Sequence, residues 1–447
     1  MYVIVVGAGE VGSYVAERLS REGHDIAVIE RDPEKCAHIS EHLDVLTVQG
    51  SGTHPSKMQE AGVAKADLVV AVTSVDEVNL LAARIAKIEG VERTVVRIEA
   101  SELRSRSAFE LCQDLGADLV IDPDEATAQE ILELLEYPGA AEVAVMAGGE
   151  VIVLGARLPE DAPIVGHTLL DIGRQYEPHW DFLFGAITRG DETIIPRGDH
   201  VVEAHDLLRV VCRRDAQREL LQLLGLQRGV PRRIMLLGGG RTAKLLAARL
   251  DARGGEVALV ERDPVRAREL AEKLPGVLIL EGDMTDSELL AEENVGGYDA
   301  VIALTGADDA NVLACLYARS AGAKETIAVV HGLALLPLLS ESGIDAALSP
   351  RTATANAVLR FVRGGVAQVA TFLEGEAEVL EFEVAAGSPA DGAVLAELRL
   401  PKDVLIGAIV RDGKAHIGRG GSQLRSRDHV VVFAMPHVVE DVKQVFG

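Results

Sequence analysis

Two glycine-rich loops contain the residues whose types and spacing could support chemistry. The first follows the apolar run Tyr2–Val6 and opens a helical pattern, so it fits the G-x-G-x-x-G motif in the context that the motif requires. In such a loop the first glycine makes a tight turn, the second lets the backbone approach a pyrophosphate, and the third lets helix and strand pack closely. The free N–H groups at the helix N-terminus then face the phosphates. The sequence therefore predicts a nucleotide site at six consecutive residues, Gly7, Ala8, Gly9, Glu10, Val11 and Gly12.

A carboxylate follows this loop at the spacing of dinucleotide sites. Glu30 ends the next apolar run, about 20 residues further on, where it can accept hydrogen bonds from a ribose diol. The same carboxylate would repel a 2′-phosphate, so the pattern favours NAD(H) or an adenine nucleotide over NADP(H). We count its neighbour Arg31 with the site. The alternative is a Rossmann fold that has lost its ligand.

A second, less complete copy of the loop begins at Gly238. Alanine at its last position, Ala243, is tolerated by the pattern, and Arg241 stands where a side chain could reach a phosphate. The alternative is a degenerate copy with a purely structural role. The second predicted site consists of Gly238, Gly239, Gly240, Arg241, Thr242, Glu261 and Arg262.

Further candidates follow the fourth and fifth apolar runs of each copy. Thr73 and Ser74, and in the second copy Thr305, lie across the predicted crevice from the glycine loop, where they could contact the ribose or nicotinamide side of a ligand. A simple helix N-cap is the alternative role. Arg97 could counter phosphate charge, or could form a surface ion pair. The matching position is Val329, so the two sites are not expected to be identical.

The elements that must position these residues are themselves duplicated. Residues 4–9 recur at 235–240 and residues 28–33 at 259–264, while Asp76 and Asn79 recur at Asp308 and Asn311. A second repeat relates Gly185–Arg189 to Gly407–Arg411. The chain therefore has the order A–B–A–B, and self-similarity of this kind indicates a tandem duplication.

Unit A alternates short apolar runs with helical stripes, which predicts βαβ units and a doubly wound parallel sheet, a Rossmann-like fold. Unit B has short strands such as 182–188 and 207–211 and a helix near 216–224, which predicts a small α+β domain. The expected fold class is thus α/β, with two Rossmann-like domains, each followed by a small α+β domain. The predicted bounds are 1–122, 141–225, 232–350 and 367–447.

Composition excludes several classes of function. A net charge of −26 argues against binding nucleic acid and against docking on an anionic membrane through a basic patch. The four cysteines are scattered without a CxxC pair, which argues against a disulfide framework or a zinc site. No apolar run approaches the roughly 20 residues that span a bilayer. We therefore expect a soluble protein, with no metal site, that meets a membrane only through a partner.

Catalytic residues are less evident than binding residues. His54 is the best candidate for a general base, but its repeat counterpart is Asp286, and a loop or capping role is the simpler reading. The acidic run 374–378 could collect a cation, although a solvated face is the simpler reading there too. We therefore expect a non-enzyme with no catalytic residues, and the alternative is an NAD-dependent oxidoreductase that uses the first Rossmann domain.

Six runs spread over essentially the whole chain match one known family: 48–55, 72–77, 135–140, 233–240, 289–293 and 405–411. With the A–B–A–B layout they resemble the TrkA family, the cytosolic regulatory subunits of Trk potassium uptake systems, whose units are called RCK domains. One departure is Glu99, because related chains often place a second basic residue just after the Arg97 position. This departure weakens the expectation of strong triphosphate binding in the first site.

The resemblance implies a peripheral protein on the cytoplasmic side of the bacterial inner membrane. It implies a homotetrameric ring beneath an integral membrane potassium channel subunit of the TrkH or TrkG type. It also implies NAD(H) and ADP/ATP as ligands of the Rossmann crevices, and regulation of the channel by exchange of these nucleotides. These properties are implied by the family and are not worked out from the residues.

Overall fold

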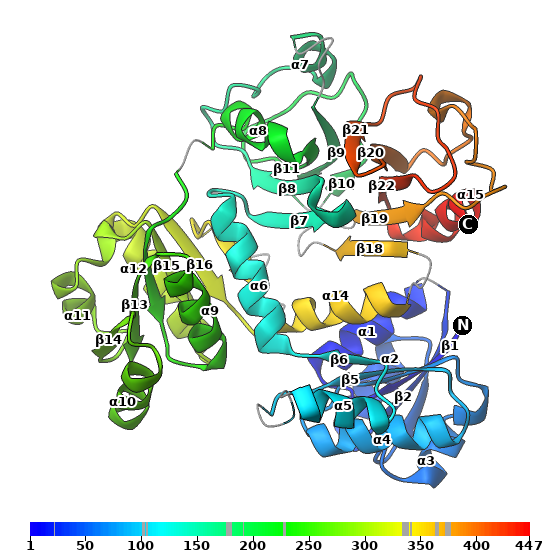
Figure 1. Ribbon diagram of the computed structural model, residues 1–447, viewed down its shortest axis with the longest axis horizontal. Helices are drawn as coiled ribbons and strands as arrows, with labels where there is room; N and C mark the ends of the chain where they lie inside the picture. Colours follow the sequence, from blue (N-terminus) through cyan, green and yellow to red (C-terminus); the bar gives the residue numbers. More distant parts are fainter. Residues whose placement is uncertain are drawn as a thin grey trace. The chain divides into compact units, whose positions relative to one another are not determined.

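The computed structural model describes residues 1–21, 23–100, 103, 106–175, 181–190, 192–226, 229–332, 339, 342–362, 366–371 and 377–447. The chain forms two compact units, and Figure 1 labels the helices and strands that build them. Unit 1 comprises Met1–Ala126 and Pro350–Gly364, and unit 2 comprises Thr127–Ser349 and Gly365–Gly447. Within the described residues, no helix combines the length and the apolar character needed to cross a bilayer.

Unit 1 contains a six-stranded sheet of order β3-β2-β1-β4-β5-β6, and every strand pair is parallel. This is the doubly wound Rossmann order, whose switch point lies between β1 and β4. The central strands carry Val, Ile, Leu and Ala almost without interruption, as strands covered on both faces must. The strands are β1 (Tyr2–Val6), β2 (Asp25–Glu30), β3 (Leu46–Gln49), β4 (Leu68–Ala71), β5 (Arg93–Arg97) and β6 (Leu119–Ile121).

The helix α1 (Glu10–Arg21) shows how the sequence determines which face of a helix packs on the sheet. Val11, Val15 and Leu19 recur at helical spacing and are buried against the sheet, and Gly23 adopts a left-handed φ of +78° just after the helix. The remaining helices of this half are α2 (Pro33–His42), α3 (Pro55–Glu60), α4 (Asp76–Ile88), α5 (Arg106–Asp114) and α6 (Pro123–Glu136).

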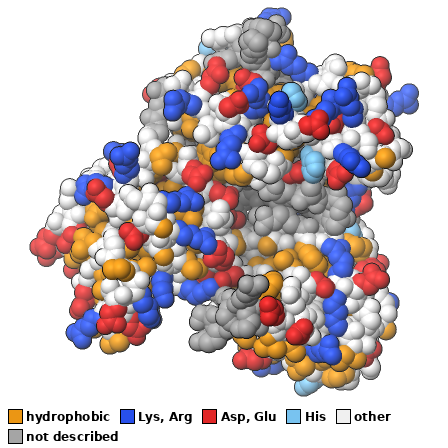
Figure 2. Space-filling view, in the orientation of Figure 1, with side chains coloured by type: hydrophobic (Ala, Val, Ile, Leu, Met, Phe, Trp, Pro, Cys, Tyr) orange, Lys and Arg blue, Asp and Glu red, His pale blue; other side chains and the backbone are white. Residues whose placement is uncertain are grey.

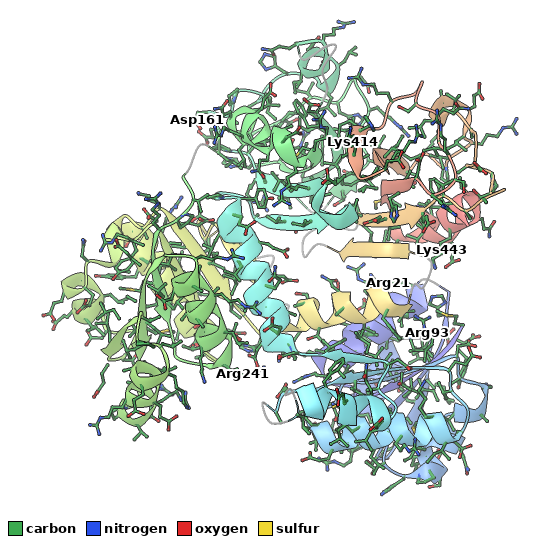
Figure 3. All side chains as sticks on the ribbon, in the orientation of Figure 1. Arg21, Arg93, Asp161, Arg241, Lys414 and Lys443 are labelled. Carbon is green, nitrogen blue, oxygen red and sulfur yellow. The ribbon has the colours of Figure 1, made fainter. Side chains whose placement is uncertain are left out.

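A helix from late in the chain completes unit 1. The helix α14 (Pro350–Val362) follows the second Rossmann sheet in sequence, yet it packs on α1, and Ala355, Val358 and Leu359 join the core that contains Val11 and Val15. Its C-terminal end is also held, because Arg93 donates from Nη1 to the carbonyl of Val362 at 3.1 Å (Figure 3). No local pattern in the sequence predicts this placement.

Unit 2 contains the second Rossmann sheet, of order β14-β13-β12-β15-β16-β17. Here α6 contributes Ile131, Leu132 and Leu135 to the core that contains Leu246 and Leu250 of α9. The strands are β12 (Arg233–Leu237), β13 (Glu256–Glu261), β14 (Leu278–Glu281), β15 (Ala300–Ala303), β16 (Glu325–Val329) and β17 (Ala346–Leu348). The helices are α9 (Arg241–Ala252), α10 (Pro264–Lys273), α11 (Ser287–Glu292) and α12 (Asp308–Ala321).

Two antiparallel sheets of five strands, of orders β10-β9-β11-β8-β7 and β18-β19-β22-β20-β21, form the rest of unit 2. They share one core, in which Val153 and Val211 of one sheet meet Val431 and Phe433 of the other. The elements of the first are β7 (Glu142–Met146), β8 (Val151–Arg157), α7 (Leu169–Gln175), β9 (Phe182–Arg189), β10 (Glu192–Ile194), β11 (Leu207–Arg213) and α8 (Gln217–Leu223). Those of the second are β18 (Val366–Thr371), β19 (Glu378–Glu383), β20 (Val404–Arg411), β21 (Lys414–Ile417), β22 (His429–Ala434) and α15 (Val439–Phe446).

The predicted fold class is confirmed: the chain has two Rossmann-like parallel sheets and two small α+β modules that arise from a tandem duplication. On the face drawn in Figure 2, acidic and basic side chains of the described residues are scattered among one another. The chain as a whole carries a net charge of −26.

Candidate functional site

The first glycine loop lies at the carboxyl end of β1, at the switch point of its sheet. Gly7 has a φ of +103° and donates from its N–H to the carbonyl of Ile29 at 2.9 Å. A Cβ on Gly12 would lie 1.9 Å from the carbonyl oxygen of Gly7, so only glycine lets α1 start this close to the loop. A Cβ on Gly9 would meet nothing within 4 Å. The backbone at Gly9 is therefore open to a ligand, as a pyrophosphate site requires.

Glu30 lies beside this loop, at the end of β2. Its Oε2 accepts a hydrogen bond from the N–H of Ala8 at 2.6 Å, and its Oε1 accepts from the N–H groups of Arg31 and Asp32 at 2.7 and 2.9 Å. The side chain is only partly buried. The carboxylate is thus fixed at the edge of the crevice and still partly accessible, which fits a residue that accepts from a ribose.

Thr73 faces the loop from the end of β4. A Cβ on Gly7 would lie 3.0 Å from Thr73 Cγ2, so the two segments are in contact. The hydroxyl of Thr73 donates to Oδ1 of the buried Asn79 at 2.7 Å, and the Asn79 amide donates to the carbonyls of Thr73 and Arg97 at 2.9 Å each. The N-cap of α4 is Val75, so Thr73 is not a simple N-cap. Ser74 is exposed beside it.

Arg97 is the last residue of β5 and lies at the same carboxyl-end edge of the sheet. Its guanidinium forms an ion pair with Glu99, which is one of the two roles predicted for it from the sequence. The side chain is 19% exposed, and its Nε is buried with no hydrogen-bond partner among the described residues. Burial lowers the pKa of Arg97 from its ordinary value, although the negative charges of Asp76 and Asp124 oppose that shift. An unsatisfied buried donor of this kind suits an anionic ligand.

The second glycine loop repeats this geometry, but its carboxylate, Glu261, is less accessible than Glu30. Gly238 has a φ of +106°, and Gly239 donates from its N–H to Glu261 Oε2 at 3.0 Å. Glu261 is buried and also lies 3.7 Å from a guanidinium nitrogen of Arg266. A Cβ on Gly240 would meet only one atom, at 3.8 Å, so this loop too leaves room at its second position. Figure 3 shows Arg241 at the start of α9.

Thr305 and Asn311 reproduce the Thr73–Asn79 arrangement. The Thr305 hydroxyl donates to Asn311 Oδ1 at 2.6 Å, and the Asn311 amide donates to the carbonyl of Val329 at 2.7 Å. Asp308 accepts from the N–H groups of His331 and Gly332 at 2.8 Å each. Burial alone would raise the pKa of Asp308, but these hydrogen bonds outweigh it and lower the pKa. The second crevice therefore has an Asp–His pair, whereas in the first the carboxylate of Asp76 accepts from the N–H groups of Glu99 and Ala100.

The structure thus brings the glycine loop, Glu30 and Thr73 together at one edge of the first sheet. It leaves Arg31 exposed next to that edge, and Arg262 at the second. Asp76 and Asn79, whose side chains hold backbone groups at this edge through hydrogen bonds, were not predicted as site residues. Their signal was present, because both recur in the repeat as Asp308 and Asn311.

The other candidates lie elsewhere. His54 is exposed at the N-cap of α3, and its counterpart Asp286 caps α11 through its carboxylate, so the shared feature of this position is a helix start. Within the described residues no cluster of His, Cys, Asp or Glu could hold a metal ion. Residues 374–376 of the acidic run 374–378 lie outside the described residues.

Comparisons with known proteins agree with the repeat. The TrkA-N domain model matches residues 3–123 and 234–350, and the TrkA-C domain model matches residues 153–225 and 379–447. The chain is 33% identical over 454 residues to the Trk system potassium uptake protein TrkA of Halomonas elongata, covering 100% of this chain and 98% of that protein. It is 35% identical over 450 residues to a TrkA homolog of Archaeoglobus fulgidus, with both chains covered completely.

Solved structures show the same fold at lower identity. The GsuK RCK domain has a TM-score of 0.59 at 18% identity, covering 99% of this chain and 94% of that one. The GsuK channel bound to NAD has a TM-score of 0.59 at 18% identity, covering 100% of this chain and 78% of that one.

Fold and crevices together define a protein built from two Rossmann-type TrkA-N units and two α+β TrkA-C units. With both models matched across most of the chain, and with full-length relatives above 30% identity, the chain belongs to the TrkA family.

Proposed function

We propose that this chain is the nucleotide-binding regulatory subunit of a Trk-type potassium channel. The observation that carries the proposal is the first glycine loop, which is open at Gly9, fixed by Glu30 and placed at the switch point of its sheet. Similarity supports the transport role, because the relatives above are named as potassium uptake proteins.

The ligands we propose are NAD(H) and ADP/ATP. Structures of GsuK bound to NAD and to ADP share this fold. In the first site the loop 7–12 would hold the pyrophosphate, Glu30 the ribose, and Arg97 the phosphate charge. Thr73 and Ser74 would contact the far side of the ligand. In the second site the loop 238–242, Glu261 and Thr305 would take the same places, and the more buried Glu261 predicts weaker binding there.

The mechanism we propose is allosteric. Two nucleotides that share a crevice differ in length and phosphate charge, and each shifts the population of conformations by its difference in affinity for them. The subunit would form a homotetrameric ring on the cytoplasmic side of the bacterial inner membrane, under a TrkH- or TrkG-like channel. The ring would change shape with the bound nucleotide and so open or close the channel.

Nucleotide titration of the full-length protein tests the sites. In Gly9→Asp and Gly240→Asp a carboxylate would enter the space of the pyrophosphate, and the lost affinity assigns each site. Gly421→Asp is a matched control, because a Cβ on Gly421 also meets nothing within 4 Å. If neither loop variant binds more weakly than this control, both site assignments are wrong.

Channel regulation is tested separately, with the partner channel reconstituted in vesicles at saturating regulatory subunit. Potassium flux should differ between ATP, ADP and NADH, and the first-loop variant should abolish that difference. Flux that is the same with all three nucleotides would contradict the regulatory role.

The alternative is an NAD-dependent oxidoreductase, because dehydrogenases use the same loop and acid. It is distinguished by incubating the protein with NADH and candidate carbonyl substrates and following absorbance at the nicotinamide band. Turnover would favour the enzyme, and binding without turnover favours the regulator.

A further inference from the structure

A cation from the second half of the chain lies at the first glycine loop. Arg351, the second residue of α14, forms an ion pair with Glu10, the first residue of α1. The Arg351 side chain is 26% exposed and that of Glu10 is 49% exposed. Burial lowers the pKa of Arg351 from its ordinary value, but a guanidinium stays charged in proteins. A positive charge is therefore held next to the predicted pyrophosphate position.

The placement of Arg351 is not left to one exposed contact. Val358, Leu359 and Val362 of the same helix are buried in the core of unit 1. At the other end, the Arg93 guanidinium lies 4.5 Å from the centre of the Phe361 ring and donates to the Val362 carbonyl. The helix is thus fixed along its length, and its first turn is fixed beside the loop.

Glu10 makes this cation necessary for a phosphate ligand. Its carboxylate follows Gly9 directly, at the helix end where phosphates would lie, and an uncompensated negative charge there would repel them. A guanidinium has five N–H donors, so Arg351 can hold Glu10 with one edge and a phosphate with another. The Nε of Arg97, buried without a partner among the described residues, points to the same ligand chemistry.

The repeat shows that the two sites differ in this respect. The position equivalent to Glu10 is Arg241. Arg351 follows β17, the last strand of the second sheet, and the equivalent position after β6, the last strand of the first sheet, is Asp124. The second loop therefore carries its own cation, whereas the first carries an acid and depends on a cation supplied from residue 351.

We propose that Arg351 is the residue of the first site that distinguishes nucleotides by phosphate charge, favouring a nucleoside triphosphate over a diphosphate and a diphosphate over a dinucleotide. The inference rests on the proposed nucleotide site at residues 7–12. A phosphate held by Arg351 would also contact α14, the helix that the second half of the sequence contributes to unit 1.

The test is titration of full-length protein with ATP, ADP and NADH, in a Gly240→Asp background that blocks the second site. Arg351→Ala should weaken ATP binding by about 10- to 100-fold, the loss of a charge-assisted hydrogen bond, and NADH binding by much less. Arg351→Lys should recover part of the ATP affinity. Glu10→Gln should strengthen ATP binding, because it removes a repulsive charge from the loop.

Arg21→Ala is the matched control, since it removes one positive charge from the far end of α1, where Arg21 pairs with Glu17. It should leave the ATP to NADH ratio unchanged. Equal losses for ATP and NADH in Arg351→Ala would show a merely structural role and overturn the inference, as would unchanged ATP binding. If Gly9→Asp also leaves binding unchanged in this background, the proposed first site itself fails. If Gly9→Asp abolishes binding and Arg351→Ala does not change it, only this inference fails.

Discussion

At the scale of single residues, the buried amide of Asn79 holds the far wall of the first crevice together. It connects the ends of β4 and β5 through the carbonyls of Thr73 and Arg97, and it accepts from the Thr73 N–H at 2.9 Å. A truncation would leave these groups without partners, and each buried unsatisfied group costs about 1–3 kcal/mol.

We therefore predict that Asn79→Ala lowers the free energy of unfolding of unit 1 by about 2–4 kcal/mol. Nucleotide affinity should fall with it, since the crevice wall loses its anchor. Urea titration and nucleotide titration measure the two effects, and Arg84→Ala, at an exposed position of the same helix α4, is the control. A loss below about 0.5 kcal/mol, the range of ordinary surface changes, would show that the network is dispensable.

The two glycines of the first loop give a second prediction, because they are required for different reasons. Gly12→Ala places a Cβ 1.9 Å from the Gly7 carbonyl and should destabilise unit 1 by about 1–3 kcal/mol, the usual cost of overpacking. Gly9→Ala meets nothing and should leave stability nearly unchanged while weakening nucleotide binding. Thermal unfolding with and without nucleotide separates the two. The same Tm for both variants without ligand would refute the distinction.

Asp299 provides a pH-dependent prediction at this scale. Backbone N–H groups of Arg233 and Arg232 and the ammonium of Lys324 donate to it and lower its pKa to about 2. A carboxyl with a lowered folded pKa stabilises the fold above its unfolded pKa of about 4, and that stabilisation is lost as the pH falls toward 2. Asp299→Asn should therefore reduce the slope of stability against pH between pH 4 and 2. An unchanged slope in acid denaturation of the variant would contradict this assignment.

At the scale of elements, local patterns predicted most of the fold. The run Tyr2–Val6 is β1, the stripe of Val11, Val15 and Leu19 is the buried face of α1, and the run 207–211 lies in β11. These features depend on periodicity and on turn glycines, which a single sequence displays. The glycine loop and Glu30 were also found, because their spacing is local.

What could not be predicted depends on contacts between distant parts of the chain. The apolar face of α14 shows that this helix is buried, but its sequence does not state that the partner is α1, about 340 residues earlier. Likewise α6 follows the first sheet and packs on α9 of the second. The contact of Arg351 with Glu10 follows from the same exchange and was invisible for the same reason.

Exchange of these two helices predicts that core truncations act on the opposite half. Leu359→Ala in α14 should destabilise β1 and α1 by about 2–5 kcal/mol, the range for buried leucine truncations. Ile131→Ala in α6 should instead destabilise β12 and α9. Native-state hydrogen exchange, read separately over the two sheets, measures both. If each variant instead loosens the sheet that precedes its own helix in the chain, the packing assigned to both helices is wrong.

At the scale of the whole molecule, the two halves of the sequence are not two folded bodies. Unit 1 takes α14 from the second half, and unit 2 takes most of α6 from the first. The two antiparallel sheets are joined in the same way. A Cβ on Gly185 would lie 2.2 Å from the Phe433 ring, so a glycine of the first half makes room for an aromatic residue of the second. This contact explains why glycine stands at that position of β9.

The halves should therefore fail to fold separately and succeed together. A fragment of residues 1–231 lacks α14 and Phe433, so the apolar faces of α1 and of the first antiparallel sheet would be left uncovered. We expect this fragment alone to aggregate or self-associate, because exposed core surface of this kind drives association. Co-expression with residues 232–447 should restore a soluble one-to-one complex that binds nucleotide, and Leu359→Ala in the second fragment should weaken that complex. Size-exclusion chromatography with light scattering measures the outcome. A stable monomeric first fragment with intact nucleotide binding would mean that the halves fold independently, and would remove the structural basis on which Arg351 couples the first site to the second half.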